Sequence, residues 1–161
     1  MNADVHERLI ALFRANTSPF RMVEHPPEGR TEVVTQIRGN RLGQAAKAMV
    51  VMVKLGKKDR QYLLCVVPGD CRIDLDVVKK LGGGTHAMFA PPAVAEQLTG
   101  CVVGAIPPVS FDTSLTLVVD PRLLENEEIV FNAGRLDRSI FIDPCAYVTA
   151  AKPTLAAIVA P

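Results

Sequence analysis

The spacing of apolar positions changes along the chain between the period of a helix and the alternation of a strand. Helical spacing predicts helices at residues 5–16, 32–38, 75–81, 92–98 and 144–151. Apolar runs and alternating segments predict strands at residues 20–25, 44–55, 61–67, 115–119, 128–133 and 139–142, and a further strand at 101–108 that is broken by a rigid loop. This irregular order argues against a doubly wound parallel sheet. The sequence therefore predicts a single α+β domain, 1–161, with a curved, mixed, largely antiparallel sheet or partly closed barrel flanked by helices.

The longest predicted strand, residues 44–55, carries a lysine within an apolar run. Side chains alternate along a strand, so Lys47 shares one apolar face with Met49 while their neighbours form a second apolar face. Two apolar faces predict a central strand covered on both sides. An ammonium group there costs free energy unless it is paired, and residues 33–58 contain no acid. Either Lys47 reaches water at the sheet rim or it binds an anion.

Composition is that of a globular protein, with a basic N-terminal third. Apolar residues make up 48% of the 161 residues and charged residues 22%, and no apolar run is long enough to span a membrane. Residues 1–60 contain 11 Lys or Arg against 6 Asp or Glu, a net charge of +5, and the remainder contains 7 against 11, a net charge of −4. A patch for a polyanion is compatible with this asymmetry, although charge counts alone favour an ordinary mixed surface.

The cysteines and histidines show no metal-binding pattern. None of the four cysteines belongs to a CxxC pair, and the three histidines add no ligand spacing. Mostly buried free thiols are expected, and the site is expected to use no metal ion and no cofactor. The N-terminal segment lacks the long apolar core of a signal peptide, so the expected location is the cytoplasm.

Two further segments are richer in glycine, proline and polar residues than packing requires. In residues 104–108, Gly-Ala-Ile-Pro-Pro, the glycine allows close approach of a ligand and the prolines stiffen the loop. Backbone amides beside such a glycine can bind an oxyanion or a carboxyl oxygen. Residues 132–139, Asn-Ala-Gly-Arg-Leu-Asp-Arg-Ser, form a polar tight turn. Taken alone, both segments are more typical of ordinary turns.

No side-chain nucleophile is indicated. The serines lack a GxSxG elbow, and no cysteine has a local nucleophile signature. His25 lies at a strand end before a proline, and His86 lies in a glycine-rich loop. Both positions are more typical of structural or rim histidines than of a catalytic base.

Together these segments resemble the YbaK/prolyl-tRNA-synthetase editing-domain family, and within it the YeaK-like stand-alone subgroup. The resemblance runs from the first predicted helix to the 140s. It is carried, in chain order, by residues 35–39, 42–44, 46–51, 98–108 and 131–134.

The resemblance implies a trans-editing activity, the hydrolysis of the ester between a wrong amino acid and the 3′ end of a tRNA. It implies catalytic roles for Lys47, which would hold the 3′-terminal nucleotide or the reacting carbonyl, and for Gly104. The loop residues that would then contact the aminoacyl group are Ala105, Ile106, Pro107 and Pro108. An aminoacyl ester is already reactive, so positioning and polarisation can suffice, with water attacking beside the substrate's own ribose hydroxyl.

The implied partner is the acceptor end of aminoacyl-tRNA, with a tRNA synthetase as a second candidate and neither membrane nor DNA expected. Sibling groups of the family act on alanine, on cysteine, or on serine and threonine, so a small or hydroxylated amino acid such as Ala, Ser or Thr is expected. The residues expected to shape its pocket are His25, Thr31, Met49, His86, Gly134 and Asp137. The alternatives are a non-catalytic module that binds RNA or a small ligand on the same fold and, more distantly, a thiol-dependent hydrolase.

Overall fold

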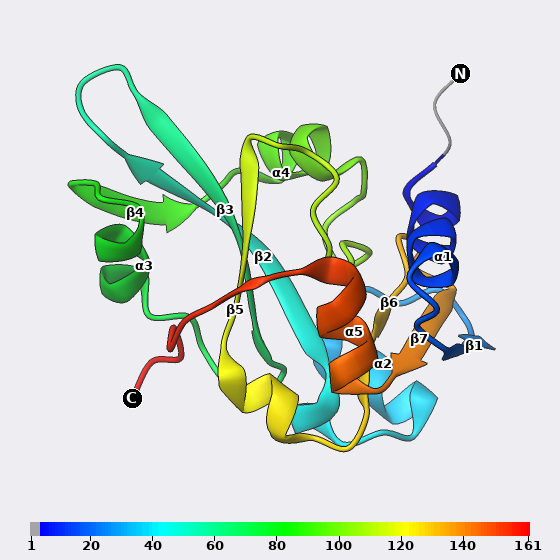
Figure 1. Ribbon diagram of the computed structural model, residues 1–161. Coiled ribbons are helices and arrows are strands. Elements are labelled where there is room, and N and C mark those ends of the chain that lie inside the picture. The colour runs from blue at the N-terminus through cyan, green and yellow to red at the C-terminus, as the bar shows by residue number, and fades with distance from the viewer. Residues whose placement is uncertain (1–3) are drawn as a thin grey trace.

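The computed structural model describes residues 4–161 and contains strands and helices in a mixed order (Figure 1). The strands are β1 (Phe20–Glu24), β2 (Ala46–Lys54), β3 (Arg60–Pro68), β4 (His86–Phe89), β5 (Leu115–Val119), β6 (Ile129–Asn132), β7 (Arg138–Ile142) and β8 (Thr154–Leu155). The helices are α1 (Val5–Ala15), α2 (Thr31–Arg38), α3 (Leu75–Leu81), α4 (Pro92–Thr99) and α5 (Pro144–Ala151). Short 3-10 helices span Leu42–Gln44 and Pro121–Glu125.

The strands form two sheets in which most neighbours run antiparallel. The smaller sheet has the order β1–β7–β6, and both of its pairs are antiparallel. The larger sheet has the order β4–β2–β3–β5–β8. In it, β2 runs antiparallel to β4 and β3, and β5 runs parallel to β3 and β8. A parallel bridge between Ala45 and Val130 joins the start of β2 to β6. The predicted α+β fold with largely antiparallel strands is confirmed, and its strands divide between two sheets.

β2 is buried on both faces, as its apolar pattern predicts. Ala46 and Val50 belong to a core shared with α1, α4, α5 and the smaller sheet. Val51 and Val53 point the other way, into a second core that includes residues of α3 and of the C-terminal segment. Lys47 lies on the face of this second core because side chains alternate along the strand.

Aspartates begin three of the helices. Asp4, Asp74 and Asp143 accept hydrogen bonds from first-turn amides of α1, α3 and α5. α2 lacks such a cap: it begins at Thr31, one residue before the predicted helix, and Arg30 precedes it without a side-chain capping bond.

Residues 101–108 were predicted as a strand broken by a rigid loop; the strand is wrong and the loop is present. The segment turns instead: the N–H of Ala105 donates to the carbonyl of Val102, Gly104 has a φ of 97°, and its two prolines have no N–H to give to a ladder. Two short strands, β4 and β8, were not predicted. β4 arises in the expected glycine-rich loop because it pairs with the edge of β2.

No helix in the described part of the chain combines the length and the hydropathy required to cross a membrane.

Candidate active site

A small cavity opens along one edge of β2. β3 pairs with the other edge over its whole length, whereas β4 pairs with the cavity edge only over residues 51–54. Within residues 4–161, no strand pairs with this edge over residues 46–49, between β4 and the bridge from Ala45 to β6. The cavity occupies this gap and has a volume of about 260 Å³.

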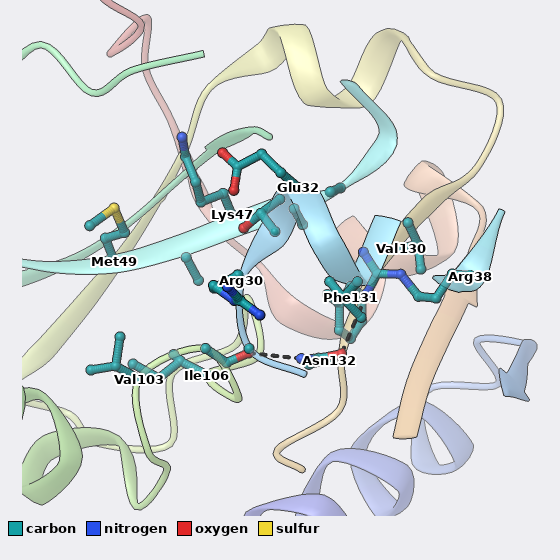
Figure 2. A pocket seen from close by; sticks show the side chains of 17 residues that line it. Arg30, Glu32, Arg38, Lys47, Met49, Val103, Ile106, Val130, Phe131 and Asn132 are labelled. Carbon is teal, nitrogen blue, oxygen red and sulfur yellow. Dashed lines mark hydrogen bonds between the residues drawn. The ribbon is translucent and has the colours of Figure 1, made fainter. Parts of the chain in front are cut away.

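Four segments line the cavity. They are α2 together with the loop before it, the start of β2, the Gly104 loop, and β6. Figure 2 shows Val103 and Ile106 on one wall, Met49 and Lys47 on β2, and Asn132 between Ile106 and Arg38. The lining residues are Gly29, Arg30, Thr31, Glu32, Val34, Arg38, Ala45, Ala46, Lys47, Ala48, Met49, Val103, Gly104, Ile106, Val130, Phe131 and Asn132. This volume lies just below the range of about 300–1,000 Å³ usual for pockets that hold drug-sized ligands, so the cavity suits a small group.

Two glycines bring two loops into direct main-chain contact at the cavity wall. A Cβ built on Gly104 would lie 2.7 Å from the Cα of Gly29 and 2.8 Å from its carbonyl oxygen. The φ of Gly104, 97°, is also one that side-chain-bearing residues rarely adopt. Within residues 4–161 the N–H of Gly104 has no hydrogen-bond acceptor. Gly104 lines the cavity, so the loop has at the cavity wall a backbone donor that no acceptor in the described residues occupies.

Asn132, the last residue of β6, ties these loops together. Its Nδ2 donates to the carbonyl of Glu28 and to the carbonyl of Gly104, both at 2.9 Å. Only 6% of Asn132 is exposed, so both bonds are shielded from water. A single buried amide thus sets the spacing of the two loops that meet at Gly29 and Gly104.

A chain of polar groups holds the Asn132 amide in this orientation. Its Oδ1 accepts from Ser139 Oγ at 3.0 Å and from Arg38 Nη1 at 3.4 Å. Arg38 Nη1 also lies 3.1 Å from Ser139 Oγ, and His25 Nε2 lies 2.7 Å from the same oxygen. Because Ser139 is fully buried, the network is rigid. It links α2 and the smaller sheet to the Gly104 loop.

Positive charge dominates the cavity lining. Arg30, Arg38 and Lys47 contribute cations, and Glu32 is the one carboxylate among the lining residues. Burial lowers the pKa of Arg38 to about 10, which leaves its guanidinium charged at neutral pH. No Asp or Glu within residues 4–161 lies within ion-pair distance of Arg38 or Lys47. The cavity therefore favours a ligand with negative charge or a developing oxyanion.

Arg30 is held at the cavity rim by Glu28. Its Nε and Nη2 donate to the two carboxylate oxygens of Glu28, both at 3.0 Å, and its N–H donates to the same carboxylate. These bonds lower the pKa of Glu28 to about 2. This ion pair between Glu28 and Arg30 lies in the same loop as Gly29. It therefore stiffens one of the two loops that Asn132 bridges.

Lys47 lines the cavity but its amine is turned to one side. Nζ donates to the carbonyl of Cys71 at 2.5 Å. Figure 2 shows the side chain leaving β2 beside Glu32, with the amine directed away from Ile106 and Asn132. An ammonium group has three hydrogens, so two remain available after the bond to Cys71.

The structure brings five of the predicted site residues together around the cavity: Thr31, Lys47, Met49, Gly104 and Ile106. Ala105, Pro107 and Pro108 are buried behind the loop and anchor it. The carbonyl of Ala105 accepts from the N–H of Gly134, and the carbonyl of Pro108 accepts from the Tyr147 hydroxyl.

The other predicted residues lie outside the cavity lining. His25 is linked to the cavity lining through Ser139, which bonds both Asn132 and Arg38. Asp137 pairs with Arg135 and Arg138 in the turn between β6 and β7. His86 is exposed on β4, opposite Lys54 of β2.

The sequence pattern does not single out Arg30, Arg38 and Asn132. Arg38 and Asn132 lie in two of the segments that carry the family resemblance, 35–39 and 131–134, but the sequence assigns neither residue a role. A further signal for Asn132 is that it lies at the end of a predicted strand, where a segment with several polar residues begins.

The buried thiols are poor nucleophiles. Burial raises the pKa of Cys65 to about 12 and that of Cys101 to about 11, and neither residue lines the cavity. At neutral pH both side chains are therefore protonated, and the structure gives no support to thiol-dependent hydrolysis.

Comparison with known proteins matches most of this chain to a recognised family. The profile of the family described as "Aminoacyl-tRNA editing domain" matches residues 25–150. A protein of Escherichia coli K12 named "Multifunctional Ser/Thr-tRNA deacylase ProXp-y" is 46% identical over 151 residues, which are 93% of this chain and 90% of that protein.

More distant similarities reach synthetases and solved structures. A proline–tRNA ligase of Methylobacillus flagellatus is 26% identical over 117 residues, 73% of this chain and 20% of the ligase. A crystal structure described as that of a candidate trans-editing enzyme for prolyl tRNA synthetase superposes with a TM-score of 0.79 at 24% identity and covers 100% of both chains. The similarity to this crystal structure is a similarity of fold.

Proposed function

This chain belongs to the family of aminoacyl-tRNA editing domains, and we propose that it hydrolyses, in trans, the ester of a tRNA that carries a wrong, small or hydroxylated amino acid. Serine and threonine are the first candidates, because the E. coli relative is named for Ser/Thr-tRNA, and alanine is the next. The observation that carries the proposal is that Lys47 and the free amide of Gly104 border one small, positively charged cavity.

The small volume supports an aminoacyl group as the occupant. About 260 Å³ is too little for a whole nucleotide with its amino acid, so the terminal adenosine would lie toward the mouth and the aminoacyl ester inside. The free N–H of Gly104 would donate to the ester carbonyl oxygen, where negative charge develops during attack. The amine of Lys47 has two hydrogens free and points away from the Gly104 loop (Figure 2), so it would neutralise the terminal phosphate.

Hydrolysis then needs only water and the substrate. Water adds to the ester carbonyl carbon and loses a proton to a base, for which the neighbouring ribose hydroxyl can act as the relay. The bond from the carbonyl carbon to the ribose oxygen breaks, and that oxygen takes up the proton. The products are the free amino acid and the tRNA with its terminal hydroxyl restored. The contribution of the protein is orientation and charge stabilisation.

A panel of charged tRNAs tests this function. The protein is incubated with Ser-, Thr-, Ala- and Cys-tRNA and with a bulky aminoacyl-tRNA such as Phe-tRNA, and loss of the ester is followed over time. We expect Ser- or Thr-tRNA to be deacylated fastest and Phe-tRNA to be spared. No turnover of any member at high enzyme concentration contradicts the proposal, and binding of acceptor ends without turnover would instead identify a binding module.

The enzyme would meet its substrate at a synthetase. Synthetases release mischarged tRNA, and related segments occur within proline–tRNA ligases, so a transient association with a synthetase in the cytoplasm would supply the substrate. Co-sedimentation of the protein with a synthetase, with and without tRNA, measures this association.

A further inference from the structure

The larger sheet ends in a cluster of basic side chains, here called the basic tip. Its members are Lys54, Lys57, Lys58, Arg60, Lys79 and Lys80. The first four lie at the end of β2, in the turn and at the start of β3, and the last two lie in the last turn of α3. Figure 1 shows the β2–β3 hairpin projecting from the body of the molecule, with β4 and α3 beside it.

Main-chain contacts hold the two halves of the basic tip next to each other. The N–H of Thr85, in the segment after α3, donates to the carbonyl of Lys54 at 2.8 Å. Gly84 packs so closely that a Cβ on it would overlap the same carbonyl oxygen. Gly82, at the end of α3, packs on Val53. The end of α3 is therefore fixed against the end of β2.

The arrangement of charge at the basic tip opposes folding. Lys54 lies directly opposite Arg60 on β3 and directly opposite His86 on β4. Like charges in directly opposed strand positions are destabilising. Residues 54–60 contain four Lys or Arg and one Asp. The one ion pair of the basic tip within residues 4–161 joins Lys79 to Asp76 at 4.0 Å. A charge that the fold does not neutralise is suited to an external anion.

The basic tip and the cavity lie along the same strand. β2 offers its free edge to the cavity over residues 46–49, and β4 covers the edge from residue 51 to Lys54. Seven residues separate Lys47 from Lys54, which is about 23 Å at roughly 3.3 Å per residue. The 3′ end of a tRNA is single-stranded for a few nucleotides before the acceptor stem begins, and this is a span of the same order.

We propose that the basic tip binds the phosphate backbone of the tRNA acceptor stem while the aminoacyl end occupies the cavity. This inference rests on the proposed function, since it assumes that the cavity receives the tRNA end. Binding through phosphates is independent of base sequence and weakens as salt is raised. The tip would therefore set affinity for tRNA in general, and the cavity would select the amino acid.

A charge-reversal variant tests the proposal. Lys57→Glu/Lys58→Glu changes two exposed residues that make no ion pair within the described chain. The matched control, Arg14→Glu/Lys152→Glu, makes the same change in net charge on α1 and after α5, away from the hairpin (Figure 1). Each protein is assayed on seryl-tRNA and on the seryl ester of a CCA trinucleotide, and its Kd for uncharged tRNA is measured between 50 and 200 mM salt.

We expect the tip variant to lose at least about tenfold in kcat/KM on seryl-tRNA and in affinity for uncharged tRNA, through KM rather than kcat. A plot of the logarithm of its tRNA affinity against the logarithm of salt concentration should be less steep. Its slope should change by about one unit for each phosphate that the variant no longer binds. The trinucleotide ester, which has no stem, should be hydrolysed equally by all three proteins.

Two results overturn the inference while leaving the proposed function intact. One is full activity of the tip variant on seryl-tRNA, or a loss no larger than that of the control. The other is an equal loss on the trinucleotide ester, which would show that the substitution acts through the cavity. If the wild type deacylates no tRNA, the proposed function fails, and the uncharged-tRNA measurements still decide whether the tip binds RNA.

Discussion

Gly29 and Gly104 touch through their main chains, and a Cβ on Gly104 would lie 2.7 Å from the Cα of Gly29. Gly104→Ala should therefore push the two loops apart, because neither backbone can move aside as a flexible side chain would. Steric overlap and the positive φ together should lower the free energy of unfolding by about 1–3 kcal/mol. Displacement of the Gly104 amide should lower kcat by roughly 100-fold or more, measured by deacylation and thermal unfolding.

Gly39→Ala separates the effect of a positive φ from the effect of steric overlap. Gly39 also has a positive φ, 77°, but a Cβ there would meet nothing within 4 Å. It should cost about 1 kcal/mol of stability through backbone strain and leave kcat unchanged. Equal losses of activity in the two variants would show that the contact with Gly29 does not shape the site.

Asn132→Ala should disconnect the two loops without adding bulk. It removes the donors to the carbonyls of Glu28 and Gly104 and leaves the Ser139 and Arg38 groups short of an acceptor. Unmaking buried hydrogen bonds of this kind should cost about 2–4 kcal/mol of stability. If Asn132 positions the Gly104 amide, kcat should also fall by about 10- to 100-fold, while KM for tRNA changes little.

Asn126 supplies a control with the same local geometry. Its Nδ2 also bridges two carbonyls, those of Gly43 at 2.9 Å and Leu123 at 3.0 Å, but outside the cavity. Asn126→Ala should lower stability and leave kcat at the wild-type value. If kcat falls in proportion to the loss of stability in both variants, the role of Asn132 is only structural.

The sequence predicts β2 and the Gly104 loop well because their signals are local. Alternation over nine residues places Lys47 and Met49 on one face, and the combination of one glycine with two prolines indicates a rigid turn whatever lies around it. The strand predicted before this loop, from residue 101, failed because a short apolar run resembles a strand, although no neighbouring strand within residues 4–161 pairs with it.

The rest of the site depends on contacts between distant segments. Asn132 acts on carbonyls at 28 and 104, and its orientation depends on Arg38 and Ser139; no spacing rule connects these positions. β4 is similar, since four residues between a glycine run and a proline become a strand only because the edge of β2 pairs with them. Local patterns predict the elements and the loop chemistry, whereas side-chain networks follow from tertiary structure.

Lys47→Met should abolish most activity at little cost in stability. The substitution keeps an apolar stem in the strand and removes one bond, from Nζ to the carbonyl of Cys71, which is worth about 1 kcal/mol. If the amine neutralises charge on the bound substrate, kcat/KM for seryl-tRNA should fall by roughly 100-fold or more. Lys47→Arg, which keeps the charge, should retain part of the activity. A fully active Lys47→Met protein would make Lys47 only a strand residue that reaches the sheet rim.

The buried thiol of Cys65 should make stability fall above pH 9. Its pKa is raised by burial to about 12 from an ordinary value near 9, so between these pH values the unfolded chain loses a proton that the folded chain keeps. The free energy of unfolding should then drop by about 1 kcal/mol per pH unit for this group. Urea titrations from pH 7 to 11 should show that Cys65→Ala, destabilised by its cavity at pH 7, approaches the wild type as pH rises. Cys145→Ala, at an exposed position, should run parallel to the wild type; parallel curves for both variants would contradict the burial argument.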